Sequence, residues 1–136
     1  MAPRSGKGTL GAAAEIFQRI CPGRLVLDHV SGRWGVPVMV LLRQGPARYF
    51  ELREAIDGVS EKMLSQTLRA LVRDGIVARR ATSSIPPRVT YELTELGRGV
   101  AGPLGDLLAW LSEHQDELVA AQRAHDELES SASSVA

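Results

Sequence analysis

Several features that define other classes of protein are scarce in this sequence. It has one cysteine in 136 residues, which excludes a disulfide within the chain and a metal site built from several cysteines. It has no run of about 18 apolar residues, the length a membrane-spanning helix needs. The N-terminus lacks a basic segment followed by an apolar stretch and a cleavage site, so we expect no secretory signal and a cytoplasmic protein.

Aromatic residues make up only 4% of the chain, against 44% hydrophobic residues in total, so aliphatic side chains must fill the core. A length of 136 residues favours a single domain. We expect this domain over residues 9–125. The polar, glycine-rich residues 1–8 and the residues 126–136, rich in serine and alanine, are expected to be disordered.

The formal net charge of zero conceals an uneven distribution along the chain. Residues 1–59 hold eight basic and five acidic residues, residues 60–91 hold six and two, and residues 92–136 hold two and nine. Nucleic acids attract a local positive surface rather than a positive total. The middle segment is therefore the candidate for contact with DNA, and the acidic last third should point away from it.

Residues 60–75 have the pattern of an amphipathic helix. Leu64, Leu68, Leu71 and Val72 follow helical spacing and predict a buried stripe. Ser60 is a suitable residue for the N-terminal cap and Gly75 for the C-terminal cap. The opposite stripe carries side chains of the types that reach phosphates and base edges: Lys62, Ser65, Gln66, Arg69 and Arg73.

Two short apolar-rich runs follow, residues 76–81 and 88–93, on either side of a polar segment broken by two prolines. This pattern predicts a β-hairpin in which Val89, Tyr91 and Leu93 share one face. Arg79, Arg80 and Arg88 lie on or near it, and Arg88 is the candidate for contact with the DNA backbone or minor groove. A basic hairpin after a basic helix is typical of a winged helix-turn-helix, mainly α with a small β-hairpin wing. The alternative is an ordinary α+β surface with scattered arginines.

The remaining pattern supports this architecture. We expect helices over residues 9–19, 22–30, 34–43 and 49–55, and a turn containing Gly58 that leads into the helix at residue 60. Two helices joined by a short turn with glycine form a helix-turn-helix. Thr94 can cap a last long helix, in which Gly97, Gly99 and the pair Gly102-Pro103 predict an irregularity.

The two terminal helices have apolar stripes that must be buried. The N-terminal stripe is Leu10, Ala13 and Phe17, and the C-terminal stripe is Leu104, Leu107, Leu108, Leu111 and Leu118. These stripes either pack on their own domain or join two subunits. We favour a homodimer, because regulators of this size bind two-fold symmetric, palindromic operators in double-stranded DNA.

The sequence resembles the HxlR family of bacterial transcriptional regulators over about residues 21–111. The matching motifs are Cys21-Pro22, Gly32-Arg33-Trp34, Leu41-Leu42, Gly45-Pro46, Tyr49-Phe50-Glu51-Leu52, Ser60, Met63-Leu64-Ser65-Gln66, Leu68-Arg69, Leu71, Asp74-Gly75, Pro86-Pro87-Arg88-Val89, Tyr91, Leu93-Thr94 and Gly97. The resemblance implies a homodimeric winged helix-turn-helix that binds an operator in the bacterial cytoplasm. Some members of the family sense electrophiles, aldehydes or oxidants through a cysteine at the position of Cys21.

The surroundings of Cys21 are compatible with such a sensor. Pro22 places it at or next to a helix N-terminus, where the helix dipole stabilises a thiolate, and Arg19 and Arg24 add positive charge nearby. A small oxidant or electrophile would then be the inducer. The alternative is a buried cysteine that packs and does not react.

Two other classes of function are open to a chain of this composition. A cysteine enzyme would use Cys21 as nucleophile and His29, His114 or His125 as base, but no glycine-rich oxyanion loop accompanies Cys21. The histidines also lack the spacing of metal ligands, so we expect no enzymatic activity, no metal and no cofactor. A winged helix that binds only proteins is the other alternative, and Gln66 and Arg69 on the basic face argue against it.

Overall fold

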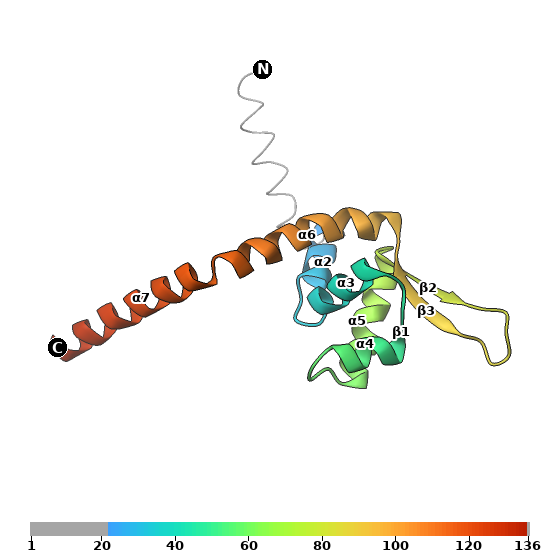
Figure 1. Ribbon diagram of the computed structural model, residues 1–136, viewed down its shortest axis with the longest axis horizontal. Helices are drawn as coiled ribbons and strands as arrows, with labels where there is room; N and C mark the ends of the chain where they lie inside the picture. The colour runs from blue at the N-terminus through green and yellow to red at the C-terminus, as the bar shows by residue number, and fades with distance from the viewer. Residues whose placement is uncertain (1–21, 136) are drawn as a thin grey trace, which may run out of the picture. The chain divides into compact units, whose positions relative to one another are not determined.

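A computed structural model of the chain describes residues 22–135 (Figure 1). The N-terminal helix predicted over residues 9–19, with Leu10, Ala13 and Phe17, and the predicted sensor Cys21 lie outside the described residues. The elements in chain order are α2 (Pro22–Val30), α3 (Gly35–Gln44), β1 (Ala47–Arg48), α4 (Tyr49–Ala55), α5 (Glu61–Arg73), β2 (Val77–Ala81), β3 (Val89–Leu93), α6 (Glu95–Glu113) and α7 (Gln115–Val135).

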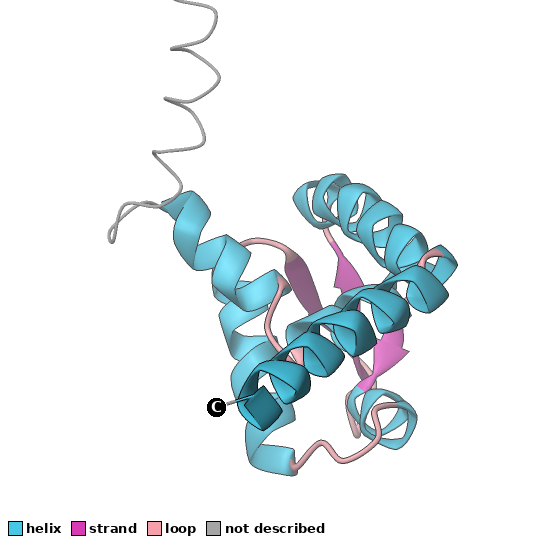
Figure 2. Ribbon diagram, turned by 90° about the vertical axis from the view of Figure 1, so that its left-hand side faces the viewer, coloured by secondary structure: helices cyan, strands magenta, loops and turns pink. Residues whose placement is uncertain are grey.

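The described residues divide into two units after Ala101. The first contains α2 to β3 and the start of α6, and Figure 2 shows its small sheet in magenta among helices in cyan. This architecture confirms the predicted winged helix-turn-helix. No single helix among the described residues is long and apolar enough to cross a membrane; α2 and α3 meet the length and composition only as a pair, which is bent by 79°.

The sheet is antiparallel with the strand order β1-β3-β2. β2 and β3 form the predicted hairpin, in which Arg79 lies opposite Tyr91. The sequence did not predict β1, which pairs Ala47 with Tyr91 on the other edge of β3. A strand of two residues is too short to show the alternation that identifies strands.

The core of the first unit is aliphatic, as its composition predicts. Each helix from α2 to α5 and both strands of the hairpin contribute to it, and no aromatic residue of the described part is among its buried side chains. The main buried residues are Val30, Val38, Met39, Leu42, Leu52, Leu64, Leu68, Leu71, Ile76, Val77 and Leu93.

Gly35 allows the close approach of α3 to the end of α2. A Cβ atom at this position would lie 1.8 Å from the carbonyl oxygen of His29 and 3.0 Å from its carbonyl carbon. Both are backbone atoms, which cannot move aside as the tip of a side chain can. Glycine is a poor helix former, yet α3 begins at Gly35. The close contact with α2 explains this, because it leaves no room for a side chain at this position. Pro37 is tolerated because it lies in the first turn of the helix.

Both ends of α5 have the caps that the sequence predicts. The backbone N–H of Met63 donates to Ser60 Oγ at 3.1 Å. At the other end Gly75 has a φ of +77°, and the N–H groups of Gly75 and Ile76 donate to the carbonyls of Val72 and Leu71, each at 3.0 Å. This hydrogen-bond pattern is a Schellman motif, which needs a left-handed residue and turns the chain directly into β2.

The long C-terminal helical segment has the predicted cap but extends further than predicted. Thr94 Oγ1 accepts from the N–H of Gly97 at 3.0 Å, which confirms the cap. α6 runs through Pro103 to Glu113 and α7 begins at Gln115, and the irregularity predicted around Gly102-Pro103 stays a prediction. A proline removes only one helical hydrogen bond, and the other bonds of the helix remain. α7 runs to Val135, where composition predicts disorder after residue 125; its alanines and glutamates favour helix.

Candidate nucleic-acid interface

α4 and α5 form the helix-turn-helix, and the hydroxyl group of Tyr49 joins the start of α4 to the first turns of α5. Tyr49, the first residue of α4, donates its hydroxyl to the backbone carbonyl of Glu61 at 3.1 Å. The same hydroxyl lies 3.3 Å from Ser65 Oγ. Tyr49 therefore positions the first two turns of α5. The sequence predicts Tyr49 as the start of a helix and as part of a family motif, but not its contact with Ser65. These two residues are 16 positions apart, and no local pattern indicates a contact over that distance.

The polar stripe predicted on α5 is present and open to solvent. Lys62, Gln66, Arg69 and Arg73 are exposed, whereas Ser65 is half-buried beside Tyr49. Arg69 Nε donates to the backbone carbonyl of Ser65 at 3.3 Å, so the guanidinium lies along the helix and keeps its terminal nitrogens for another partner. Within residues 22–135, no carboxylate forms an ion pair with any cation of this stripe. Its positive charge is therefore available to a polyanion.

The two acidic residues nearest the stripe are both held by basic partners. Glu61 Oε1 lies 2.8 Å from Arg53 Nη1. Asp74, whose side chain is only 5% exposed, has Oδ2 at 2.6 Å from His29 Nδ1. The second contact also joins the last turn of α2 to the end of α5. Each acid therefore contacts its own partner, and neither forms an ion pair with the arginines between them.

The wing has two faces with different chemistry. On the outer face Arg80 forms an ion pair with Glu92. On the inner face Arg79 follows the buried Val77 and lies opposite Tyr91. Arg88 is exposed just before β3, where its N–H donates to Thr82 Oγ1 and its carbonyl accepts from the N–H of Thr82, both at 2.9 Å. Thr82 and Arg88 thus close the loop of the wing, so Arg88 lies at the base of the loop.

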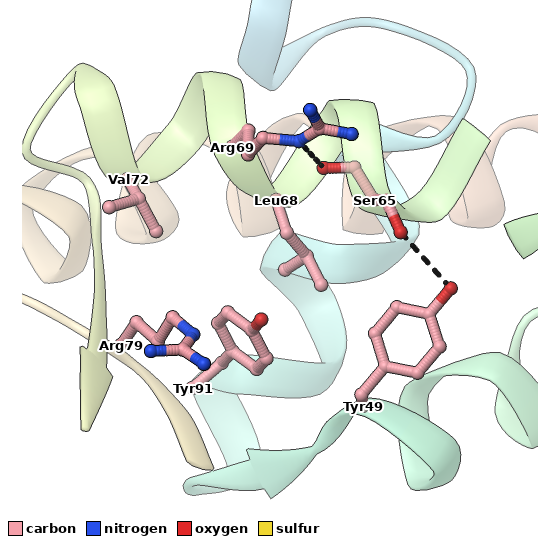
Figure 3. A pocket seen from close by; sticks show the side chains of 7 residues that line it. All are labelled: Tyr49, Ser65, Leu68, Arg69, Val72, Arg79 and Tyr91. Atoms are coloured by element: carbon pink, nitrogen blue, oxygen red, sulfur yellow. Dashed lines mark hydrogen bonds between the residues drawn. The ribbon is translucent and has the colours of Figure 1, made fainter. Parts of the chain in front are cut away.

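A groove of about 310 Å³ separates α5 from the inner face of the wing (Figure 3). Ser65 and Leu68 point toward it from α5, Arg79 and Tyr91 lie on the wing and Tyr49 at the start of α4, whereas the guanidinium of Arg69 lies along α5 at the border of the groove. The lining residues are Tyr49, Ser65, Leu68, Arg69, Val72, Arg79 and Tyr91. Val72, which the sequence places in the buried stripe, is half-buried because it borders this groove.

A family model described as HxlR-like helix-turn-helix matches residues 29–119. The chain belongs to this family. It is 46% identical over 105 residues to YtfH of Escherichia coli, an uncharacterized HTH-type transcriptional regulator, and the match covers 77% of this chain and 83% of that protein.

Solved structures of similar proteins have the same fold. YtfH from Salmonella typhimurium, a putative transcriptional regulator, is 42% identical with a TM-score of 0.72, over 79% of this chain and 96% of that one. The redox regulator HypR in its oxidized form is 32% identical with a TM-score of 0.63, over 68% of this chain and 96% of that one. This HxlR-like chain is thus a helix-turn-helix protein whose relatives are named transcriptional regulators.

The second unit of the HxlR-like chain, from Gly102, carries the predicted C-terminal stripe. Leu107, Leu111 and Leu118 are exposed in the single chain, and Leu104 and Leu108 are half-buried. Trp110, which the sequence pattern adds to this stripe, is exposed as well, and so is Val119. Trp110 stacks on His114 with 4.1 Å between the ring centroids.

The three histidines of the HxlR-like chain occupy separate structural positions. His29 contacts Asp74, His114 stacks on Trp110, and His125 Nε2 lies 3.2 Å from Glu129 Oε1 one helical turn away. No group of three metal-ligating side chains occurs among the residues that the structure describes.

Proposed function

We propose that this HxlR-like regulator binds a palindromic DNA operator as a homodimer, with α5 in the major groove. The observation that carries this proposal is the exposed polar stripe of α5, whose cations have no carboxylate partner among residues 22–135. Backbone phosphates attract such cations, and guanidinium and amide groups read base edges. A regulator of this kind acts on the chromosome, in the bacterial cytoplasm.

The roles of the individual side chains follow from where they lie on α5 and the wing. Gln66 and Arg69 are exposed at the centre of the stripe and would contact base edges, with Ser65 beside them. Lys62 and Arg73 would contact phosphates on either side. Arg88 at the base of the wing loop would reach the DNA backbone or minor groove.

The proposal predicts different effects for two cations of α5. Arg69→Ala should weaken binding to an operator selected from random duplex DNA by about 5- to 150-fold, roughly 1–3 kcal/mol, and relax the preference at one position. Lys62→Ala should weaken binding to all sequences alike and reduce the salt slope by about one. Fluorescence anisotropy at several salt concentrations measures both quantities.

Arg123 provides the matched control, since it is an exposed cation on α7, which is not one of the elements of the proposed interface. Arg123→Ala should leave both affinity and salt slope unchanged. Arg69→Ala with unchanged affinity and selectivity would show that this arginine does not contact the bases.

We further propose that the leucine stripe of α6 and α7 joins the two subunits, together with the N-terminal stripe. The exposed leucines of one chain would find apolar partners on the second copy, and the acidic character of this segment keeps it away from DNA. The two α5 helices would then reach half-sites about one DNA turn apart, roughly 34–36 Å, or a multiple of it.

We propose that Cys21 is the site at which an oxidant or electrophile controls DNA binding. Support comes from Pro22, a residue that commonly begins a helix and that follows Cys21 in the sequence, and from the relative HypR, whose name describes it as a redox regulator. Thiols at a helix N-terminus are more readily deprotonated and so more reactive. Because the chain has one cysteine, its products are a disulfide between subunits, a mixed disulfide, a sulfenic acid or an alkylated thiol.

Treatment with diamide is expected to lower operator affinity of the wild type and to leave Cys21→Ser unaffected. Non-reducing electrophoresis and intact mass identify the product, and anisotropy measures the affinity before and after reduction. Equal loss of binding in both proteins, or alkylation of Cys21 no faster than that of a free peptide thiol, would contradict the role of sensor.

A further inference from the structure

The groove between α5 and the wing combines cationic, hydroxyl and apolar groups in one place. Leu68 is buried and Val72 half-buried, so an aliphatic surface forms one wall. The rings of Tyr49 and Tyr91 face this wall from α4 and from β3 (Figure 3). With a volume of about 310 Å³, the groove is large enough for a small organic molecule and lies near the lower limit of known ligand sites.

The charge of the groove is positive and unbalanced. Arg69 and Arg79 border it from two different elements, and none of its lining residues is acidic. Neither arginine forms an ion pair with a carboxylate within residues 22–135, whereas the neighbouring Arg80 on the outer face does. Arg79 is held toward the groove by the strand register, which places it opposite Tyr91 and two residues after the buried Val77.

We infer that this groove binds a small aromatic carboxylate and that its occupation prevents DNA binding. A guanidinium group binds a carboxylate through two parallel hydrogen bonds. The aliphatic wall and the two phenol rings suit a flat aromatic ring. Ser65 and Arg69 line the groove and also belong to the proposed DNA-contacting stripe, so one occupant excludes the other. The exclusion of DNA rests on the proposed function, whereas the ligand site itself does not.

A DNA phosphate is the other anion that could meet these arginines. It is the weaker candidate, because a phosphodiester needs hydrogen-bond donors but gains nothing from the apolar wall of Leu68 and Val72. A carboxylate site and a phosphate site predict different effects of Arg79→Ala, and the following experiment distinguishes them.

The test is a titration of the full-length protein with benzoate, followed by NMR or calorimetry in the absence of DNA. Benzamide, which has the same shape and no charge, is the matched ligand. Benzoate is expected to bind saturably and at least tenfold more tightly than benzamide. Arg79→Ala should weaken benzoate binding at least tenfold. Arg80→Ala removes a charge from the outer face of the same strand and should leave benzoate binding unchanged, and melting curves confirm that both variants are folded.

A second arm adds operator DNA at constant ionic strength. Benzoate should lower the operator affinity of the wild type and of Arg80→Ala, and should have at least tenfold less effect on Arg79→Ala. Equal binding of benzoate and benzamide, or benzoate binding that survives Arg79→Ala, would overturn the ligand site. Loss of operator affinity in Arg79→Ala with unchanged benzoate binding would assign the groove to a DNA phosphate. Benzoate binding that needs Arg79 but leaves operator affinity unchanged would support the site and overturn its competition with DNA.

Discussion

Glutamate in place of both Leu107 and Leu111 is expected to convert the proposed homodimer into monomers. The two leucines lie four residues apart on α6 and so share one face of the helix. In a two-fold interface each added carboxylate would lie near its own copy from the other subunit, without a partner and away from water. Light scattering measures the molar mass, which should fall to that of one chain at concentrations where the wild type is dimeric.

A matched variant adds the same two charges to the other side of the same helix. Gly102 and Ala109 lie seven residues apart on the face opposite Leu107 and Leu111, and a Cβ at Gly102 would meet nothing within 4 Å, so Gly102→Glu with Ala109→Glu should stay dimeric. Circular dichroism should show native helix content in both double variants. A Leu107→Glu, Leu111→Glu protein that is still dimeric and helical would mean that the stripe is not the interface. Operator affinity should fall when the dimer is lost, because each monomer would bind only one half-site.

Alanine in place of Gly35 is expected to destabilise the first unit strongly. The new Cβ would lie 1.8 Å from the carbonyl oxygen of His29, so α2 and α3 must separate to accept it. That movement would disturb Val38, Met39 and Leu42, which are buried along α3. We expect a loss of roughly 3 kcal/mol or more, at the upper end of the cost of overpacking. Thermal unfolding at a fixed protein concentration should show a midpoint lower by about 10 °C or more.

Gly99 is the matched control for this substitution. It lies within α6, and a Cβ at its position would meet nothing within 4 Å. Gly99→Ala should therefore raise stability slightly, by up to about 1 kcal/mol, because alanine favours helix over glycine. A Gly35→Ala protein as stable as the wild type would show that the α2–α3 turn can open without cost.

The local elements of this chain could be predicted because local residues specify them. Ser60 and Gly75 mark the two ends of α5 through hydrogen bonds to backbone groups no more than four residues away. The alternation of Val89, Tyr91 and Leu93 identifies the second strand of the wing for the same reason. β1 escaped prediction because two residues carry no pattern, and its partner Tyr91 is more than forty residues distant in the chain.

Some residues of the candidate site could likewise be predicted from local pattern, and others could not. Helical periodicity was sufficient to place Lys62, Gln66 and Arg69 on one exposed stripe. It could not show that Tyr49 supports α5, that His29 holds Asp74, or that Arg79 borders a groove. Each of these depends on how separate elements pack, which no local pattern encodes.

By itself, the sequence determined the helices from α2 to α6 and the hairpin of the wing, which faces they bury and where positive charge gathers. These properties depend on residues within a few positions of one another. Tertiary structure alone decided that Gly35 must be glycine, that the acids beside the α5 stripe have basic partners, and that α5 and the wing enclose a cationic groove. The physical reason is that steric exclusion and charge pairing act through space, between atoms that the chain brings together only when it folds.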